Sequence, residues 1–132
     1  MRTRPALTAD DVKKILAACE AEAAKNKWNV SIAVTDEAGY MLGFTRMDGA
    51  GSITAEVAHL KAKGAAMTGR SSKFLEDRLK ERVAFLNFPV GLPVQGGIPL
   101  LYQGERVGAI GVSGVQSHED EQIADAGAAT IK

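Results

Sequence analysis

Residues 30–46 read Val-Ser-Ile-Ala-Val-Thr-Asp-Glu-Ala-Gly-Tyr-Met-Leu-Gly-Phe-Thr-Arg and predict a β-hairpin, around which the rest of the fold is arranged. The first half alternates large apolar and smaller side chains, which is typical of a strand buried chiefly on one face. The residues of Asp36–Gly39 are typical of a turn, and Gly39 suits a positive φ. A second strand then runs over 40–47. We expect its even-numbered side chains, Tyr40 to Arg46, to share one face.

The segments on either side of this hairpin predict a mixed α+β domain. Helical spacing of apolar residues and capping residues indicate helices, and turn signals with alternation indicate two further strands. The expected helices are 9–27, 53–68, 73–86 and one beginning at Ser117; the further strands are 98–102 and 106–114. Hairpin connections imply antiparallel pairing, with helices covering both faces of the sheet. Pro99 predicts that its strand lies at a sheet edge. No linker divides the chain, so 1–132 is expected to be a single domain.

Composition and charge exclude several classes of function. The chain has 132 residues, 16 basic and 16 acidic side chains, and 45% apolar residues, which provides a core but no basic surface for nucleic acid. Aromatic residues make up only 5%, too few for stacking platforms on single-stranded nucleic acid. Cys19 is the single cysteine, so there is no disulfide framework. We find no apolar run long enough to span a membrane and no secretory signal, and we expect a cytoplasmic protein without membrane partners.

His59 is the histidine with the most promising surroundings for chemistry. It lies inside the helix expected over 53–68, one turn after Glu56, so the two side chains share a helical face. A paired imidazole and carboxylate could orient a metal or haem ligand, or transfer a proton. A histidine at the polar rim of a helix would show the same pattern. We therefore take His59 and Glu56 as candidate catalytic residues, and His59 as the candidate metal ligand.

Two glycine-containing loops are candidate ligand-binding segments. Arg46 and Asp48 end a predicted strand and precede Gly49 and Gly51, and an arginine there could bind a carboxylate or form a surface ion pair. The second loop holds the pair Gly96-Gly97, whose backbone N–H groups could bind an anion or form a tight turn. We predict one cleft bounded by 46–51, 56–59 and 95–98, completed in an oligomer by a neighbouring subunit.

Four blocks of this sequence resemble the GlcG/HbpS-like haem-binding family. The first two are Val34-Thr-Asp-Glu-Ala-Gly39 and Phe44-Thr-Arg-Met-Asp-Gly49, which are similar to the family's V-D-x-x-G and R-M-D-G blocks. The other two are Gly91-Leu-Pro-Val-Gln-Gly-Gly-Ile-Pro-Leu100 and Gly104-Glu-Arg-Val-Gly-Ala-Ile-Gly-Val-Ser-Gly114. They occur in order and cover nearly the whole chain. The family includes the C-terminal domain of a propanediol-utilisation corrinoid protein.

This resemblance implies a five-stranded antiparallel sheet flanked by helices, and subunits that assemble into dimers and larger rings. It also implies a homo-oligomeric accessory protein that binds a small ligand, with haem or a related tetrapyrrole as the leading candidate. Many members sit in catabolic operons. Some ligate iron through a histidine of the first helix, where this chain has none. The side chains that could ligate haem iron here are His59, Met41 and Met47, and imidazole is preferred.

Two other classes of function remain open. One is an enzyme that acts on a small organic acid, with Arg46 or Arg70 binding the carboxylate and His59 or Glu56 moving a proton. The other is a structural subunit with no ligand. The many glycines of 106–114 predict that something packs closely there: a helix, a ligand or another subunit. Gly64, inside a helix, predicts a close approach of backbones. We expect subunit contacts at 106–114, at 87–97 and at the exposed methionine and phenylalanine positions.

Overall fold

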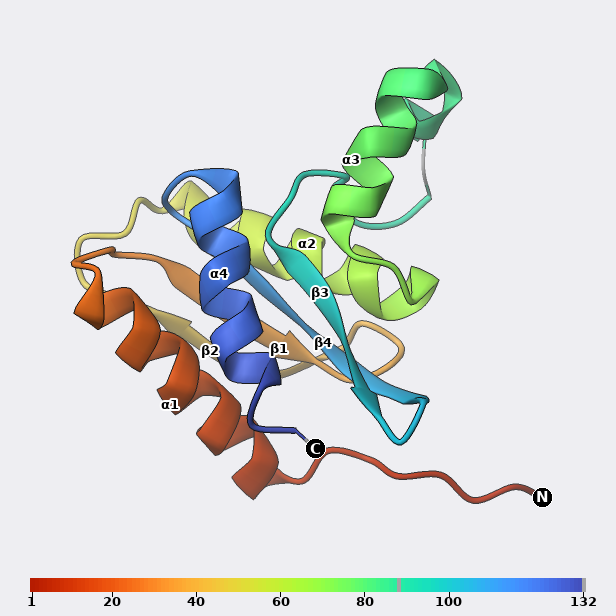
Figure 1. Ribbon diagram of the computed structural model, residues 1–132, viewed down its shortest axis with the longest axis horizontal. Coiled ribbons are helices and arrows are strands. Elements are labelled where there is room, and N and C mark those ends of the chain that lie inside the picture. The colour runs from red at the N-terminus through yellow and green to blue at the C-terminus, as the bar shows by residue number, and fades with distance from the viewer. Residues whose placement is uncertain (88, 132) are drawn as a thin grey trace.

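The predicted hairpin is formed in the computed structural model, which describes residues 1–87 and 89–131. Strands β1 (Ser31–Thr35) and β2 (Met41–Arg46) pair antiparallel (Figure 1). The turn is held by the Asp36 carboxylate, which accepts hydrogen bonds from the backbone N–H groups of Ala38 and Tyr40, both at 2.9 Å. Gly39 has φ +89°, as the turn requires.

The sheet has four strands within the described residues, not the five that the family resemblance implied. Strands β3 (Gly97–Tyr102) and β4 (Glu105–Ser113) complete an antiparallel sheet in the order β2-β1-β4-β3. The stretch before β3 is rich in proline and glycine and forms bends, because proline lacks the N–H that strand pairing needs. β3 is an edge strand that contains Pro99, as predicted.

Helices cover both faces of the sheet (Figure 1). Helices α1 (Ala9–Lys25) and α4 (Ser117–Ala128) lie together on one face and enclose the main core, to which β1 and β4 contribute valine and isoleucine. Helix α2 (Ile53–Thr68) lies on the other face, across β1, β4 and β3. None of the described helices is long and apolar enough to cross a membrane.

Helix α2 packs unusually close to the sheet because the residues between them are small. This seam consists of alanines: Ala33, Ala58, Ala62, Ala65, Ala66 and Ala109. At Gly111 of β4, a Cβ would lie 2.0 Å from the Ala58 carbonyl oxygen, so only glycine fits. Gly64 of α2 meets the Gly91 backbone, with 3.3 Å from a built Cβ to the Gly91 Cα, which confirms the predicted close approach.

Strand β4 is therefore not a subunit contact. It is a central strand covered by α2 on one face and by α4 on the other, so the element predicted to pack against its glycines is a helix of the same chain. The glycines that led us to expect a subunit contact are what allows this packing within the chain.

The helix expected over 73–86 is shorter than predicted. Helix α3 (Ser72–Glu81) begins at the Ser71 cap, whose Oγ accepts a hydrogen bond from the Phe74 N–H at 3.1 Å. Arg82 is extended, and a 3₁₀ helix, η1 (Val83–Asn87), follows. Together α3 and η1 project beyond the edge of the sheet (Figure 1).

Candidate functional site

The His59 side chain is half-buried on α2 and is held by the β1–β2 turn. Its Nε2 lies 3.3 Å from the Gly39 carbonyl oxygen. A carbonyl oxygen only accepts, so Nε2 carries the hydrogen and donates it. The lone pair of the ring is then on Nδ1. Metal-ligating histidines are typically oriented in this way, by donating the second ring N–H to a carbonyl or a carboxylate.

Beside His59 lies an exposed surface on the α2 side of β2. Phe44 and Arg46 pair with Ala33 and Ser31, so these two β2 side chains point toward the α2 face. Helix α2 packs on the other three strands and barely reaches β2, so the α2 face of this edge strand is left open. Phe44 is 38% exposed as a result.

A bulge in β2 adds Met41 to the same surface. The register shifts between Val34 and Thr35, so that Met41 pairs with Thr35 and joins Phe44 on the α2 side. Strict alternation predicted the opposite face for Met41. The side chain is 40% exposed and lies two residues from Gly39, the carbonyl that holds His59. We call Met41, Phe44 and Arg46 the β2 ledge.

Polar groups flank His59 along α2. Glu56, one turn before it, is exposed, in keeping with the predicted shared face. Lys63, one turn after it, packs its aliphatic stem on the turn: a Cβ built at Gly39 would lie 2.7 Å from Lys63 Cγ. The imidazole thus lies between a carboxylate and an ammonium along α2, at the Gly39 end of the ledge.

The predicted Arg46–Gly51 segment forms a different, shallow hollow. A depression of about 390 Å³ is lined by Glu20, Asn29, Thr45, Arg46, Met47 and Asp48. Arg46 Nε donates to the Ala50 carbonyl oxygen at 3.0 Å. Gly49 has φ +88° and lies against Asn29, whereas a Cβ at Gly51 would meet nothing within 4 Å. The hollow lies at the end of β2 away from the Gly39 turn that holds His59.

Gly96 and Gly97 are buried rather than open to a ligand. The Gly97 N–H donates to Ser72 Oγ at 2.7 Å, and a Cβ at Gly96 would lie 2.7 Å from Lys61 Nζ. Both glycines lie toward the β3 edge, while His59 faces the β2 edge. Since α2 lies between them, a single chain does not bring the three predicted segments into one cleft.

An ion pair that sequence reasoning missed lies beneath α2. Lys61 Nζ is 3.1 Å from Asp120 Oδ2 and also donates to the Val112 carbonyl oxygen at 3.0 Å, and both charged residues are 2% exposed. Asp120 accepts a second hydrogen bond from the Val115 N–H at 3.1 Å. Burial raises the pKa of the Asp120 carboxyl, and the Lys61 charge opposes this. The sequence signal for this buried ion pair was a lysine placed among the alanines of α2.

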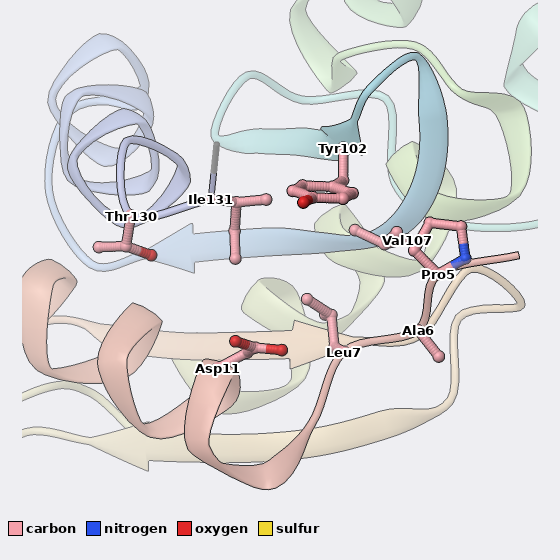
Figure 2. Close-up of a pocket in the computed structure, with 8 residues that line it drawn as sticks. All are labelled: Pro5, Ala6, Leu7, Asp11, Tyr102, Val107, Thr130 and Ile131. Atoms are coloured by element: carbon pink, nitrogen blue, oxygen red, sulfur yellow. The ribbon is translucent and has the colours of Figure 1, made fainter.

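A second cavity lies on the opposite side of the sheet (Figure 2). It encloses about 380 Å³ and is lined by Pro5, Ala6, Leu7, Asp11, Tyr102, Val107, Thr130 and Ile131. Sequence reasoning did not find it, because its walls come from three segments far apart in the chain. It holds no histidine, cysteine or methionine.

The described residues contain no group of three or more His, Cys, Asp or Glu side chains placed to hold a metal ion. A metal that arrives within a macrocycle is different, because the macrocycle supplies the equatorial nitrogens and the protein needs to add only axial donors. A single oriented imidazole beside exposed apolar side chains fits this requirement.

Comparisons with known proteins identify the family of this chain. The family model described as "Haem degrading protein HbpS-like" matches residues 7–129. The chain belongs to the HbpS-like family. Among relatives, it is 39% identical over 114 residues to the protein GlcG of Escherichia coli (strain K12), covering 86% of this chain and 85% of GlcG.

Solved structures share the fold over nearly the whole chain. A crystal structure of a Streptomyces reticuli HbpS double mutant is 33% identical, with a TM-score of 0.93, and covers 100% of this chain and 91% of that one. The crystal structure of a PduOC:heme complex has a TM-score of 0.89 at 23% identity, over 97% of this chain and 96% of that one. At that identity the likeness shows the fold alone.

Proposed function

We propose that this protein is a homo-oligomeric accessory protein that binds haem or a related tetrapyrrole on the β2 ledge, with His59 as the axial ligand. The observation that carries this proposal is the contact from His59 Nε2 to the Gly39 carbonyl oxygen, which orients the imidazole; with Nε2 donating to this carbonyl, Nδ1 is the ring nitrogen that can ligate iron. Family membership supports haem as the ligand class.

The residues around His59 suit the parts of a haem. Met41 and Phe44 offer apolar contact for the macrocycle, and both are exposed in a single chain. Lys63 at the turn and Arg46 at the far end of the ledge are cations that can pair with propionate groups. When bound, the haem would supply a redox-active iron; the chain's own contribution is to orient the imidazole and cover the ring.

The open ledge also supports self-association. A macrocycle lying on β2 would be covered by a single chain on one face only, over Met41 and Phe44, and its other face would remain in contact with water. A second copy that closes over the ledge would remove this surface from water, in a closed symmetric assembly.

The alternative function, an enzyme that acts on a small organic acid, requires an arginine, Arg46 or Arg70, and a proton-transfer group, His59 or Glu56, at one ligand. Arg70 follows α2, and its guanidinium lies over the Phe74 ring, 4.8 Å from the centroid. His59 is held at the Gly39 end of β2 and Arg46 lies at the other end of the strand. The six residues of β2 span five steps along the strand, roughly 16 Å. This separation favours a broad ligand over a small carboxylate.

Haem titration followed by absorption tests the proposal. We expect native protein to develop a Soret band, and His59→Ala to shift its maximum or weaken binding roughly tenfold or more. His118→Ala is the matched control, since His118 is exposed at the start of α4. An unchanged spectrum and affinity for His59→Ala would overturn the assignment, and Met41→Leu and Met47→Leu would then test the thioether ligands. No Soret band with native protein would overturn the function itself.

A further inference from the structure

The cavity of Figure 2 has no role in the proposed haem site. Its floor includes Val107, which belongs to the core between the sheet and helices α1 and α4. His59 belongs to α2, which covers the opposite face of the sheet. The cavity is therefore a separate feature, and it requires its own explanation.

The walls of the cavity are fixed to the protein core. Leu7, Tyr102 and Ile131 are partly buried against the core cluster, and Val107 is 3% exposed. They come from the segment before α1, the base of the β3–β4 hairpin and the segment after α4 (Figure 2). Because these four side chains pack in or against the core, this part of the cavity wall is in place before any ligand binds.

The polar side-chain atoms of the lining are all oxygens. Asp11 Oδ2 accepts a hydrogen bond from the Thr8 N–H at 2.8 Å, and hydrogen bonds from Thr8 lower the pKa of the Asp11 carboxyl, so it is ionised at neutral pH. The Thr130 hydroxyl donates to the Gly127 carbonyl at 2.8 Å, which leaves its oxygen as an acceptor. The Tyr102 ring faces Ile131 across the cavity (Figure 2).

The charge of the lining selects among ligands. Asp11 is the one charged residue among the eight that line the cavity, and there is no lysine or arginine among them. An anionic ligand such as a carboxylate would meet like charge there, whereas an ammonium would meet a carboxylate and neutral acceptors. The remaining lining is apolar, or aromatic at Tyr102, which suits a hydrocarbon or aromatic body.

We propose that this cavity binds a small, mainly apolar molecule that carries an ammonium group, with its apolar body against Leu7, Val107, Tyr102 and Ile131 and its ammonium group at Asp11. It is a second ligand site, independent of haem. The cavity volume of about 380 Å³ lies at the small end of the range for ligand pockets, so it suits a small molecule.

Three probes of similar shape and different charge test the proposal: benzylamine, benzyl alcohol and benzoate. In protein labelled at its methyl groups, benzylamine is expected to shift the NMR signals of Leu7, Val107 and Ile131 in a saturable way. Benzoate is expected to bind about tenfold more weakly, and the difference should shrink with added salt. No saturable shift of these methyls with benzylamine, or equal binding of benzoate, would overturn the proposal.

Matched variants separate the site from general charge effects. Asp11→Asn removes the charge but retains an oxygen for the Thr8 N–H, so it should abolish the preference for benzylamine over benzyl alcohol. Asp10→Asn removes the same charge from the same exposed turn, outside the cavity, and should leave the preference intact. An equal loss in both variants would overturn the role of Asp11.

Filling the cavity provides the last test. Ala6 lines the cavity from the exposed segment before α1, so Ala6→Phe should fold normally and abolish binding of benzylamine. Its haem titration should match that of native protein, since His59 lies across the sheet. Loss of haem binding in Ala6→Phe would overturn the independence of the two sites.

Discussion

At the scale of single residues, the buried ion pair of Lys61 and Asp120 is costly to break. Removing one partner leaves the other charge buried without compensation, whereas removing both leaves an apolar contact. Helix α2, strand β4 and helix α4 meet at this pair, through the Val112 carbonyl and the Val115 N–H. It therefore joins the two helical layers on either side of the sheet.

We expect Lys61→Met to lower the free energy of unfolding by about 3–5 kcal/mol, because the Asp120 carboxylate is left buried and unpaired. The double variant Lys61→Met/Asp120→Leu should recover most of the loss. Urea denaturation measures both. A double variant as unstable as the single one would mean that the hydrogen bonds to Val112 and Val115, rather than the charges, carry the stability.

The pH dependence of the same variant follows from the Asp120 carboxyl. Burial raises the pKa of this group, and loss of the Lys61 charge raises the pKa further. A raised carboxyl pKa means that the folded state binds the proton more tightly than the unfolded state, so stability falls as pH rises from the ordinary carboxyl pKa of 3.8 through the folded pKa. The loss in the free energy of unfolding caused by Lys61→Met should thus be complete at neutral pH and should shrink under acid conditions.

At the scale of elements, the packing of α2 on the sheet depends on small residues. The alanine seam and Gly111 allow the helix backbone to approach β4, where a Cβ would lie 2.0 Å from the Ala58 carbonyl oxygen and 2.6 Å from the Ala62 nitrogen. Both atoms are backbone, so no rotamer change can relieve the contact. The position of His59 depends on this packing, since it lies next to Ala58 on α2.

We therefore expect Gly111→Ala to destabilise the fold by about 1–3 kcal/mol, since α2 must move away from the sheet. Gly51→Ala is the matched control, because a Cβ there meets no atom within 4 Å. Thermal unfolding of both variants measures the difference. Equal midpoints for Gly111→Ala and native protein would mean that α2 has more freedom than this packing implies.

At the scale of the whole molecule, the open edge strand predicts where copies of the chain meet. If the β2 ledge is covered by a second copy, Phe44→Glu places a charge in that contact and should convert the assembly to smaller species in light scattering. Leu101→Glu is the control on the other edge strand, at a leucine that is 55% exposed. Native protein that is monomeric at micromolar concentration would contradict self-association. Dissociation by Leu101→Glu alone would place the contact on β3.

Sequence patterns alone determined the element order, the hairpin and the turn at Gly39, because these depend on local periodicity and on backbone conformations that few residues adopt. The family could also be recognised from its ordered glycine-rich blocks. The close approach at Gly64 was predictable for the same local reason: a glycine inside a helix costs stability unless a neighbour needs the space.

Only the tertiary structure decided the arrangement of the site. The bulge that turns Met41 toward α2 and the pairing of Lys61 with Asp120 depend on the strand order β2-β1-β4-β3 and on which face α2 covers. The same is true of the Gly96-Gly97 pair. Ser72 Oγ accepts the Gly97 N–H, and Lys61 occupies the space that a side chain at either position would need. Local periodicity carries no information on contacts between distant segments. Such contacts are set by packing, where backbone distance decides which side chains meet.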